Sequence, residues 1–332
     1  MQGSRDARFN TRSYRPGDEQ QILDLFARSF HQPLTEERWR WKYERNPAGN
    51  ERISLTFDEA NRLAGHYAAY PVPFIDRGET LTALQVGDTM TEPSIRHIGR
   101  GPTSILGRTA LYFYENFCEG RVAFNYGFNV ANIQKFSLRF LRSDRVEPVT
   151  YRVLQRSRIK PISRPERWTR GYQLELLSEA TSELDELFDR AQAAYSFLVR
   201  RDASYIRWRY LQFPDSQYIV VGIRKWRKLV GWSVFRVREQ RLTWGDALFD
   251  PARADAAEVM LRHIAPGYPI EVVEGWFPPR PPWFDEVLTG LGFETAPEPQ
   301  DLSLMCVPFM LPDAVERMRD RLYYTWGDSD LF

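Results

Sequence analysis

A short segment between residues 96 and 103 has the residue types and the spacing of an anion-binding turn. It reads Arg96-x-x-Gly99-x-Gly101, and apolar residues at helical spacing begin at Ile105. Glycine adopts positive φ values without strain, so several backbone N–H groups of such a turn can point at one centre. A helix that starts just beyond the turn adds the positive end of its dipole. The segment therefore predicts an anion site that suits a pyrophosphate.

The elements that must position this turn follow from the flanking sequence. Apolar patterns predict a strand over 81–89 before the turn and a helix over 105–117 after it. Upstream, Asp18 with Gln21 resembles a capping box, which predicts the start of a helix. The same kinds of pattern predict the remaining elements of this half: strands over 8–14, 53–57, 63–75, 122–128 and 149–154, and a helix over 133–141.

A weak internal repeat divides the chain into two halves. Three short matches recur in the same order: Trp41-Lys42-Tyr43 with Trp208-Arg209-Tyr210, Gly65 with Gly231, and Gly87-Asp88 with Gly245-Asp246. Ordered self-similarity of this kind indicates a duplicated structural unit. A proline-rich, basic stretch at 158–165 has no periodicity and is typical of a linker. We therefore expect two domains, at residues 1–157 and 158–332.

Composition excludes several classes of protein. The 332 residues carry 45 basic and 44 acidic side chains, a net charge of +1, whereas nucleic-acid-binding domains usually have a basic excess. Two cysteines and four scattered histidines form no disulfide framework and no metal-ligand cluster, so we expect no bound metal. No apolar run reaches the ~20 residues that span a bilayer, and the first residues do not resemble a signal peptide. We expect a cytoplasmic protein that binds neither nucleic acid nor membrane.

The Arg-x-x-Gly-x-Gly turn between a strand and a long helix resembles the acyl-CoA pyrophosphate loop of the GNAT superfamily of N-acyltransferases. The order of elements over residues 9–155 is similar to that family, and residues 170–310 are similar in a weaker form. The resemblance implies an α/β (α+β) fold of two tandem GNAT-like modules, each a mixed, mostly antiparallel sheet flanked by helices. It also implies an enzyme of EC class 2.3.1. Such an enzyme moves an acetyl or acyl group from acetyl-CoA, or another acyl-CoA, to an amine on a small molecule or amino sugar.

The same resemblance implies which residues contact the acyl-CoA. The pyrophosphate is expected to lie on the backbone N–H groups of the turn, and Arg96 either supports the turn or meets the phosphates. The end of the preceding strand, at Met90 and Thr91, is expected to bond the pantetheine arm. Asparagines after the next strand fall where the family often has a cofactor contact. The remaining residues of this expected site are Ile98, Gly99, Arg100, Gly101, Pro102, Thr103, Asn129 and Asn132.

The catalytic groups are less well defined, because the chain departs from the family's pattern. Phe136 stands where many members have a tyrosine that protonates the leaving thiolate, so Tyr126 on the adjacent strand is the substitute candidate. Asp88 and Glu92 are the candidates for deprotonating the amine, since a carboxylate can act directly or through water. The second half keeps the equivalent Asp246 without a glycine-rich turn, which also fits a structural role for Asp88.

The second half lacks the glycines of the turn, so it is expected to shape the acceptor site and not to bind CoA. Its aromatic cluster of Trp276, Phe277, Arg280 and Trp283 fits either a pocket wall or a core-packing loop, and Asp328 with Asp330 offers too few ligands for a cation. Two alternative functions remain. One is a Fem-type aminoacyl transferase, which uses aminoacyl-tRNA; the other is a catalytically degenerate binding or scaffold protein.

Overall fold

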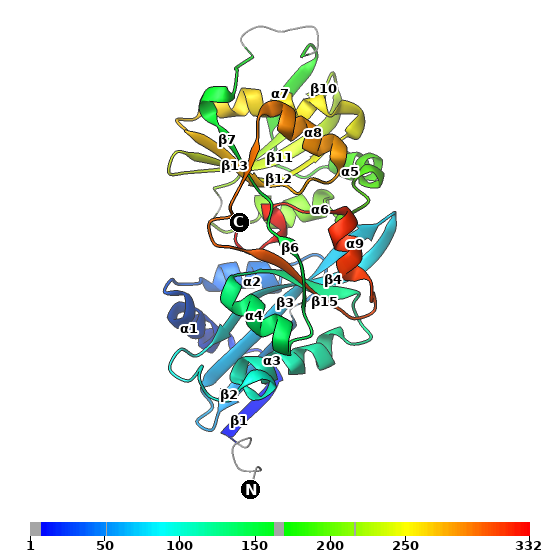
Figure 1. Cartoon of the computed structure of the whole chain (residues 1–332). Coiled ribbons are helices and arrows are strands. Elements are labelled where there is room, and N and C mark those ends of the chain that lie inside the picture. The colour runs from blue at the N-terminus through cyan, green and yellow to red at the C-terminus, as the bar shows by residue number, and fades with distance from the viewer. Residues whose placement is uncertain (1–7, 51, 163–168, 216) are drawn as a thin grey trace. The chain divides into compact units, whose positions relative to one another are not determined.

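The computed structural model of the chain describes residues 8–50, 52–162, 169–215 and 217–332 (Figure 1). The chain forms two compact units, each built from three separate segments. The first unit contains Met1–Pro73, Leu81–Glu147 and Leu302–Glu316. The second contains Phe74–Thr80, Pro148–Asp301 and Arg317–Phe332.

The first unit has the predicted elements in the predicted order, together with three that the sequence did not predict, at Glu36–Tyr43, Asp144–Pro148 and Ser303–Pro308. Its helices and strands are β1 (Phe9–Ser13), α1 (Glu19–Phe30), α2 (Glu36–Tyr43), β2 (Arg52–Asp58), β3 (Leu63–Asp76), β4 (Glu79–Thr91), α3 (Ile105–Phe113), β5 (Phe124–Asn129), α4 (Ala131–Phe140), β6 (Asp144–Pro148) and β15 (Ser303–Pro308). The last three residues of β3 and the first two of β4 belong to the second unit.

The sheet of the first unit has the strand order β1-β2-β3-β4-β5-β15-β6. Neighbouring strands run antiparallel at β1 with β2, at β2 with β3 and at β5 with β15. The exception is β4 with β5, which run parallel from Ala83 opposite Phe124 to Gln85 opposite Tyr126. A parallel pair needs a crossover connection, and α3 supplies it. The turn at residues 96–103 therefore lies on the path from one parallel strand to the next.

The starts of the first two helices are held by different contacts. Helix α2 starts at Thr35, whose side-chain oxygen accepts a hydrogen bond from the Arg38 amide at 3.2 Å, as an N-cap residue does. The expected capping box at Asp18 does not form. Asp18 instead makes a two-pronged ion pair with Arg12, at 2.6 and 2.7 Å, and Gln21 Oε1 accepts from the Leu63 amide at 2.9 Å. At this helix start, Asp18 and Gln21 bond partners outside the helix and not its first amides.

The second unit repeats the same plan. Its elements are β7 (Tyr151–Gln155), β8 (Tyr172–Leu176), α5 (Ser182–Tyr195), β9 (Phe197–Val199), α6 (Ala203–Ile206), β10 (Ile219–Lys225), β11 (Lys228–Arg238), β12 (Arg241–Phe249), α7 (Asp255–Ile264), β13 (Val272–Trp276), α8 (Pro282–Leu291), β14 (Glu294–Ala296), α9 (Ala314–Arg321, from Arg317 onward) and β16 (Leu322–Tyr323). Its sheet has the order β14-β7-β13-β12-β11-β10-β8. The strands β12 and β13 run parallel and are joined through α7, as β4 and β5 are through α3. The prediction of two tandem modules with mixed, mostly antiparallel sheets is confirmed.

The compact units differ from a division at residue 157 in three places, of which the segment Phe74–Thr80 is described above. Strand β7, which the sequence pattern assigned to the first half, pairs with β13 and β14 of the second unit. Strand β15, late in the chain, pairs with β5 of the first unit, from Ser303 opposite Asn129 to Pro308 opposite Phe124. Each unit thus completes its sheet with a strand from the other half of the sequence. Of the expected linker at 158–165, residues 163–165 lie outside the described part.

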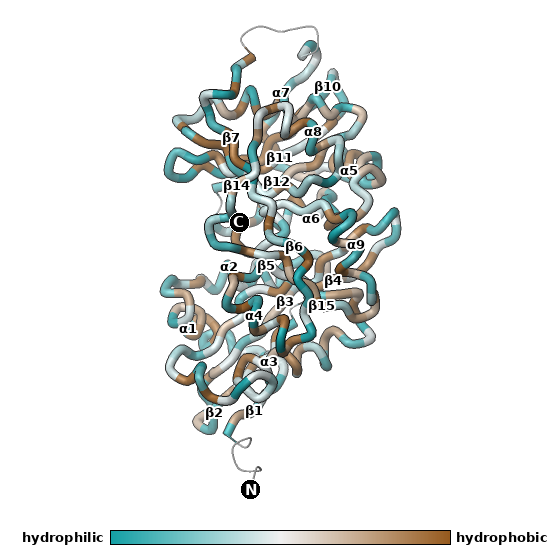
Figure 2. Tube along the Cα trace, in the orientation of Figure 1, coloured by the Kyte–Doolittle hydropathy of each residue, from teal (hydrophilic) through white to brown (hydrophobic). Residues whose placement is uncertain are grey.

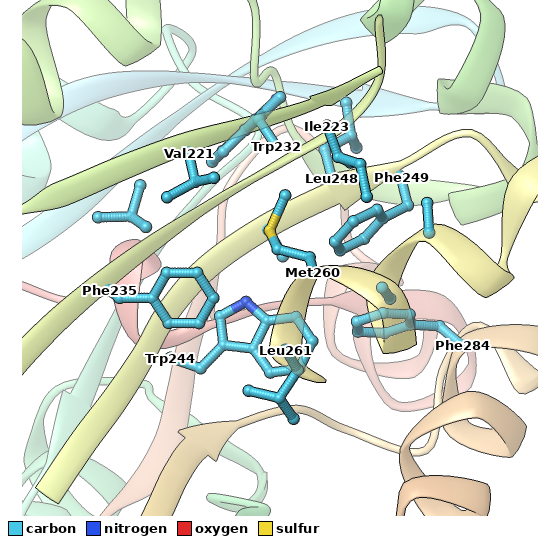
Figure 3. Close-up of a cluster of buried hydrophobic side chains, with 14 of the residues drawn as sticks. Val221, Ile223, Trp232, Phe235, Trp244, Leu248, Phe249, Met260, Leu261 and Phe284 are labelled. Atoms are coloured by element: carbon cyan, nitrogen blue, oxygen red, sulfur yellow. The ribbon is translucent and has the colours of Figure 1, made fainter. Parts of the chain in front are cut away.

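Each unit has its own apolar core. In the first, Tyr67, Phe113 and Tyr114 pack with neighbours from β4 and the segment after α3. In the second, Phe235, Trp244 and other large side chains fill the space between the sheet and helices α7 and α8 (Figure 3). Along the chain, hydrophobic residues recur on the strands and hydrophilic ones on many of the turns (Figure 2). This pattern of burial is what holds each sheet to its helices.

Three further features bear on the chemistry. Both cysteines, Cys118 and Cys306, are buried free thiols. No three side chains of histidine, cysteine, aspartate or glutamate group into a cation site within the described residues. None of the helices in those ranges has the length and apolarity that a bilayer crossing requires.

Candidate active site: a glycine turn beside two parting strands

The glycine turn leads directly into helix α3. Gly99 and Gly101 have φ values of +77° and +52°, and a short 3-10 helix covers Gly101–Thr103. Ser104 then caps α3: its Oγ donates to the Gly101 carbonyl at 2.6 Å and accepts from the Gly107 amide at 3.0 Å. The turn is therefore anchored to the first turn of the helix, as the sequence pattern predicts.

Neighbouring atoms leave no space for side chains at three glycines. A Cβ on Gly99 would lie 2.4 Å from the Thr103 carbonyl oxygen, and one on Gly101 would lie 2.7 Å from the Phe140 ring. Gly107 is as tightly enclosed, because a Cβ there would lie 2.1 Å from the Gly101 carbonyl oxygen. The sequence pattern pointed to the first two but missed Gly107, since a glycine inside a helix carries no spacing signal of its own.

The amide groups of the turn divide into two sets. Those of Ile98 and Thr103 donate to carbonyls within the turn, at 2.9 and 3.1 Å, and the Arg100 amide donates to Thr103 Oγ1 at 3.3 Å. The amides of Gly99 and Gly101 donate to no acceptor within the described ranges. Pro102 has no N–H group. The free N–H donors are thus those of Gly99 and Gly101, together with the unpaired first amides of α3.

Beside the turn, the parallel strands β4 and β5 part. Their described pairing ends at Gln85 and Tyr126, and beyond it Met90 and Thr91 follow on β4 while Asn129 ends β5. Met90 is buried and Thr91 half-buried. The carbonyl of Asn129 accepts from Gln134 Nε2 at 2.7 Å, which ties β5 to the start of α4. The opening between the strands is thus flanked by three of the expected cofactor residues.

Most of the other expected cofactor residues are exposed. Arg96 and Arg100 extend from the turn into solvent, and Asn132 is exposed in the first turn of α4. Ile98 is also exposed, at 37%, although it is apolar. These side chains lie where a bound molecule could reach them from solvent.

Asp88 lies at a backbone irregularity in β4 and is held by two side chains of α2. Its φ is +50°, and its Oδ2 contacts Lys42 Nζ at 2.8 Å and Tyr43 Oη at 2.7 Å. Burial would raise the pKa of this carboxyl, but the Lys42 ammonium and the two hydrogen bonds hold the pKa below its ordinary value. The carboxylate is therefore ionised and already has partners.

His66 lies next to this cluster and was not among the sequence candidates. Its Nδ1 is 2.7 Å from the Asp88 carbonyl oxygen, which can only accept, so Nδ1 carries the hydrogen. Its Nε2 is buried and has no hydrogen-bond partner in the described structure. Burial lowers the pKa of His66 to about 4, so the ring is neutral near pH 7 and Nε2 has a free lone pair. Only the three-dimensional contact reveals this group, because a lone histidine has no motif.

Glu92 and Tyr126, the other catalytic candidates, also have partners. Glu92 Oε2 accepts from Arg28 at 2.8 Å, and burial is outweighed by that ion pair, which keeps the Glu92 pKa below its ordinary value. The Tyr126 hydroxyl donates to Gln85 Oε1 at 3.4 Å, an oxygen that also accepts from Tyr70 at 2.5 Å. Each candidate therefore belongs to a separate small cluster.

The comparison with protein families identifies the module. Residues 10–137 match the model of the acetyltransferase (GNAT) domain. These residues form a GNAT acetyltransferase domain. Enzymes of this family are transferases of EC class 2.3.1 that use acyl-CoA as co-substrate and amines as acceptors, so the domain at residues 10–137 supports a transferase of that class. No curated protein sequence matches the chain significantly.

Solved structures extend the likeness to the whole chain. A probable N-acyltransferase from Enterococcus faecalis V583 is similar with a TM-score of 0.70 at 12% identity, over 91% of this chain and 73% of that one. A tandem GNAT protein from the clavulanic acid biosynthesis pathway has a TM-score of 0.55 at 14% identity, over 90% and 98%. The Saccharomyces cerevisiae N-myristoyltransferase with bound myristoyl-CoA has a TM-score of 0.55 at 12% identity, over 91% and 79%. At sequence identities this low, the structural similarity shows the fold alone.

In the GNAT-like second module, aromatic side chains fill the region where the parallel strands β12 and β13 part. The described pairing of β12 with β13 ends at Trp244 opposite Gly275, and the next residue, Gly245, faces the Phe332 ring. A Cβ on Gly245 would lie 1.8 Å from that ring. Trp326 stacks on Trp276 at 4.8 Å with an interplanar angle of 8°. The last residues of the sequence thus pack into the second module.

The same module has no counterpart of the glycine turn. After β12 a 3-10 helix at Pro251–Arg253 precedes α7, and Asp250 caps it by accepting from the Ala252 amide at 3.0 Å. Trp276 and Phe277, members of the aromatic cluster, are fully buried, which fits the core-packing interpretation. Asp328 is buried and accepts from Arg201 at 2.5 Å, so it is paired with a cation of the protein.

Proposed function

We propose that the chain is an N-acyltransferase that moves an acetyl or other acyl group from acyl-CoA to the amine of a small molecule or amino sugar. The observation that carries the proposal is the free pair of amides at Gly99 and Gly101, which lie at the start of α3 beside the parting of β4 and β5. Backbone N–H groups at a helix start bind phosphate oxygens well. The GNAT family model gives the proposal its reaction class.

The other expected cofactor residues are assigned to the same molecule. In this proposal Met90 and Thr91 on β4 and Asn129 after β5 flank the pantetheine arm, while Arg96, Arg100 and Asn132 meet the phosphates or the nucleotide from solvent. Ile98, Pro102 and Thr103 shape the turn. The amides of Ile98 and Thr103 are already bonded within it, so their contribution is to hold the glycine amides in place.

The reaction forms a bond between the amine nitrogen and the acyl carbon and breaks the carbon–sulfur bond, so the amine must lose a proton. Asp88 and Glu92 remain candidates to accept it, and His66 joins them because its Nε2 is an unpaired base. In this proposal Asp88 acts through its carbonyl, which holds His66 in the tautomer with Nε2 free. Tyr126 remains a candidate proton donor for the sulfur.

The second module is proposed to shape the acceptor site without binding acyl-CoA, since Phe332 and Trp326 fill the region around Gly245 and Trp276. The acceptor is not a nucleic acid in this proposal, because the net charge of +1 gives no basic excess. A cytoplasmic location stays a prediction.

A catalytically degenerate binding protein is the second candidate, because Phe136 packs against Phe140, with 5.3 Å between ring centroids, and offers no hydroxyl.

Isothermal titration with acetyl-CoA tests the proposal. We expect micromolar binding by the wild-type chain and a loss of at least about tenfold in Gly99→Asp, because the new carboxylate displaces the turn and repels phosphate. Gly120→Asp is the matched control: Gly120 also has positive φ, at +64°, but a Cβ there meets nothing within 4 Å. Absence of acetyl-CoA binding by the wild type, or equal binding by Gly99→Asp, would overturn the assignment. Binding of aminoacyl-tRNA by the wild-type chain would instead favour the Fem-type alternative.

A further inference from the structure

A small cavity lies where the strands of the GNAT domain part. Its volume is about 30 Å³, enough for one or two water-sized groups. It is bounded by Val86 on β4 and Gly127 on β5, the residues that follow the last paired positions of the two strands. The rest of its lining comes from Tyr67, Tyr114, Asn125, Tyr126, Asn129, Ser137, Ser143, Met305, Cys306 and Val307.

Two tyrosines that line this cavity contact each other through their hydroxyl groups. Tyr67 of β3 and Tyr114, in the π-helical turn that continues α3, have their oxygens 3.2 Å apart, and both side chains are almost fully buried. The pair carries two hydroxyl hydrogens, and their mutual hydrogen bond uses one. The other hydrogen has no acceptor among the residues that the structure describes. A buried donor without an acceptor is costly unless a ligand or water completes it.

Burial keeps both hydroxyls of the pair protonated, because it raises the pKa of Tyr67 and that of Tyr114. Either oxygen can donate the hydrogen bond that joins the two tyrosines, and both residues line the cavity. One hydroxyl hydrogen of the pair therefore remains for a group in the cavity.

We propose that Tyr67 donates to Tyr114, and that the Tyr114 hydroxyl in turn donates a hydrogen bond to the sulfur of acyl-CoA and stabilises the thiolate that leaves. This inference rests on the proposed function. It assigns to Tyr114 the contact with sulfur that a phenylalanine at position 136 cannot make, and Ser137, the next residue along α4, lines the same cavity. The lining also includes Met305, Cys306 and Val307, which give the cavity an apolar side that a sulfur atom can contact.

In the proposed step, Tyr114 does not change its charge. As the amine nitrogen bonds to the acyl carbon, the electron pair of the carbon–sulfur bond goes to sulfur. The thiolate accepts the hydrogen bond from Tyr114, which keeps its proton because burial disfavours a tyrosinate. The thiolate takes a proton from solvent on release. A thioester sulfur is a weak acceptor and a thiolate a strong one, so the contact strengthens as the bond breaks, which is the condition for lowering the barrier.

The test uses CoA and desulfo-CoA, in which hydrogen replaces the thiol, so no acceptor amine is required. In complex with the wild-type chain, the ultraviolet absorbance of the CoA thiolate should show a thiol pKa lowered by about one unit, which is a preference of about tenfold for the thiolate. The affinity for CoA relative to desulfo-CoA should rise by the same factor between about pH 7 and about pH 9. Both effects should disappear in Tyr114→Phe.

Tyr112→Phe is the matched control, because Tyr112 is on the same helix and its hydroxyl contacts Ser13 at 3.4 Å, away from the cavity lining. Failure of both CoA and acetyl-CoA to bind the wild type would reject the proposed function itself. Binding with an unshifted thiol, or a shift that Tyr114→Phe retains, would reject the role of Tyr114 alone. An unshifted thiol in the wild-type complex rejects the role of Tyr114 even if Tyr114→Phe does not fold.

Discussion

The Tyr43 hydroxyl donates to Asp88 Oδ2 at 2.7 Å. The second module has the same contact, because Tyr210 donates to Asp246 Oδ2 at 2.6 Å. In each case the tyrosine ends a Trp-basic-Tyr match and the aspartate ends a Gly-Asp match of the internal repeat. The two separate matches are therefore one structural unit, in which a tyrosine on a helix holds the aspartate of the central strand. The unit is present with and without a glycine turn, which favours a structural role for the carboxylate.

Removing either tyrosine hydroxyl should destabilise its own module. We expect Tyr43→Phe and Tyr210→Phe each to lower the free energy of unfolding by about 1.5–3 kcal/mol, the usual range for a hydrogen bond to a charged group. Urea unfolding measures the change. Tyr112→Phe, which loses a neutral contact of 3.4 Å, should cost less than either. A loss from Tyr43→Phe no greater than that of the control would show that the contact with Asp88 is energetically neutral.

Lys42 and Asp88 should be strongly coupled. Their side chains are only 10% and 12% exposed and lie 2.8 Å apart, so removing one charge leaves the other buried without its partner. We expect Lys42→Met and Asp88→Asn each to cost about 3–5 kcal/mol, and the double variant to cost clearly less than the two together. A double-mutant cycle by urea unfolding checks this. Strictly additive losses would mean that the ion pair contributes nothing.

The sequence predicted the order of elements and the glycine turn because both depend on local chemistry. Strand and helix periods identified the elements around Gly99 and Gly101, and the repeat identified the second module. The helix start at Asp18 was predicted correctly, but the Asp18 side chain bonds Arg12 and not a helix amide. The strands β7 and β15 could not be assigned to their sheets, because pairing of residues more than a hundred positions apart leaves no local pattern.

The side chains that complete the candidate site were also beyond local pattern. His66 is one of four scattered histidines, and only its contact with the Asp88 carbonyl gives it a fixed tautomer. Tyr114 is one apolar-face position of a helix, and its hydroxyl matters only because Tyr67 and the cavity face it. Gly107 is required by the proximity of the Gly101 carbonyl. Each of these depends on a neighbour that the sequence places far away or leaves unspecified.

The burial of His66 predicts a pH dependence of stability. Burial lowers the folded-state pKa to about 4 from the ordinary value of 6.5. Between these values the unfolded chain binds a proton that the folded chain does not, so stability must fall as the pH falls through this window. The loss should reach on the order of 3 kcal/mol at about pH 4, from ~1.4 kcal/mol per pKa unit. Above pH 6.5 the term is absent.

His66→Asn isolates this effect, because its amide nitrogen can still donate to the Asp88 carbonyl while the titrating ring is gone. Asp328 titrates in the opposite sense, since burial raises its pKa to about 6, but it is common to both proteins and cancels in the difference. The free energy of unfolding of the wild type minus that of His66→Asn should therefore decrease from about pH 6.5 to about pH 4. His97→Asn, at an exposed site, is the control. A difference that does not vary with pH would mean that His66 is protonated normally in the folded chain.

The contact between Gly245 and Phe332 predicts a non-additive pair in the second module. A Cβ on Gly245 would lie 1.8 Å from the ring, so Gly245→Ala should cost about 1–3 kcal/mol by overpacking. Phe332 is 3% exposed, and Phe332→Ala should cost about 3–5 kcal/mol through the space that it leaves. In the double variant the smaller side chain makes room for the new methyl group, so its loss should be smaller than the sum. Urea unfolding of the four proteins measures the coupling, with Gly267→Ala as control, because a Cβ there meets nothing within 4 Å. If Gly245→Ala is as mild as Gly267→Ala, the ring does not occupy this position in solution, and the region beside β12 is open to a ligand.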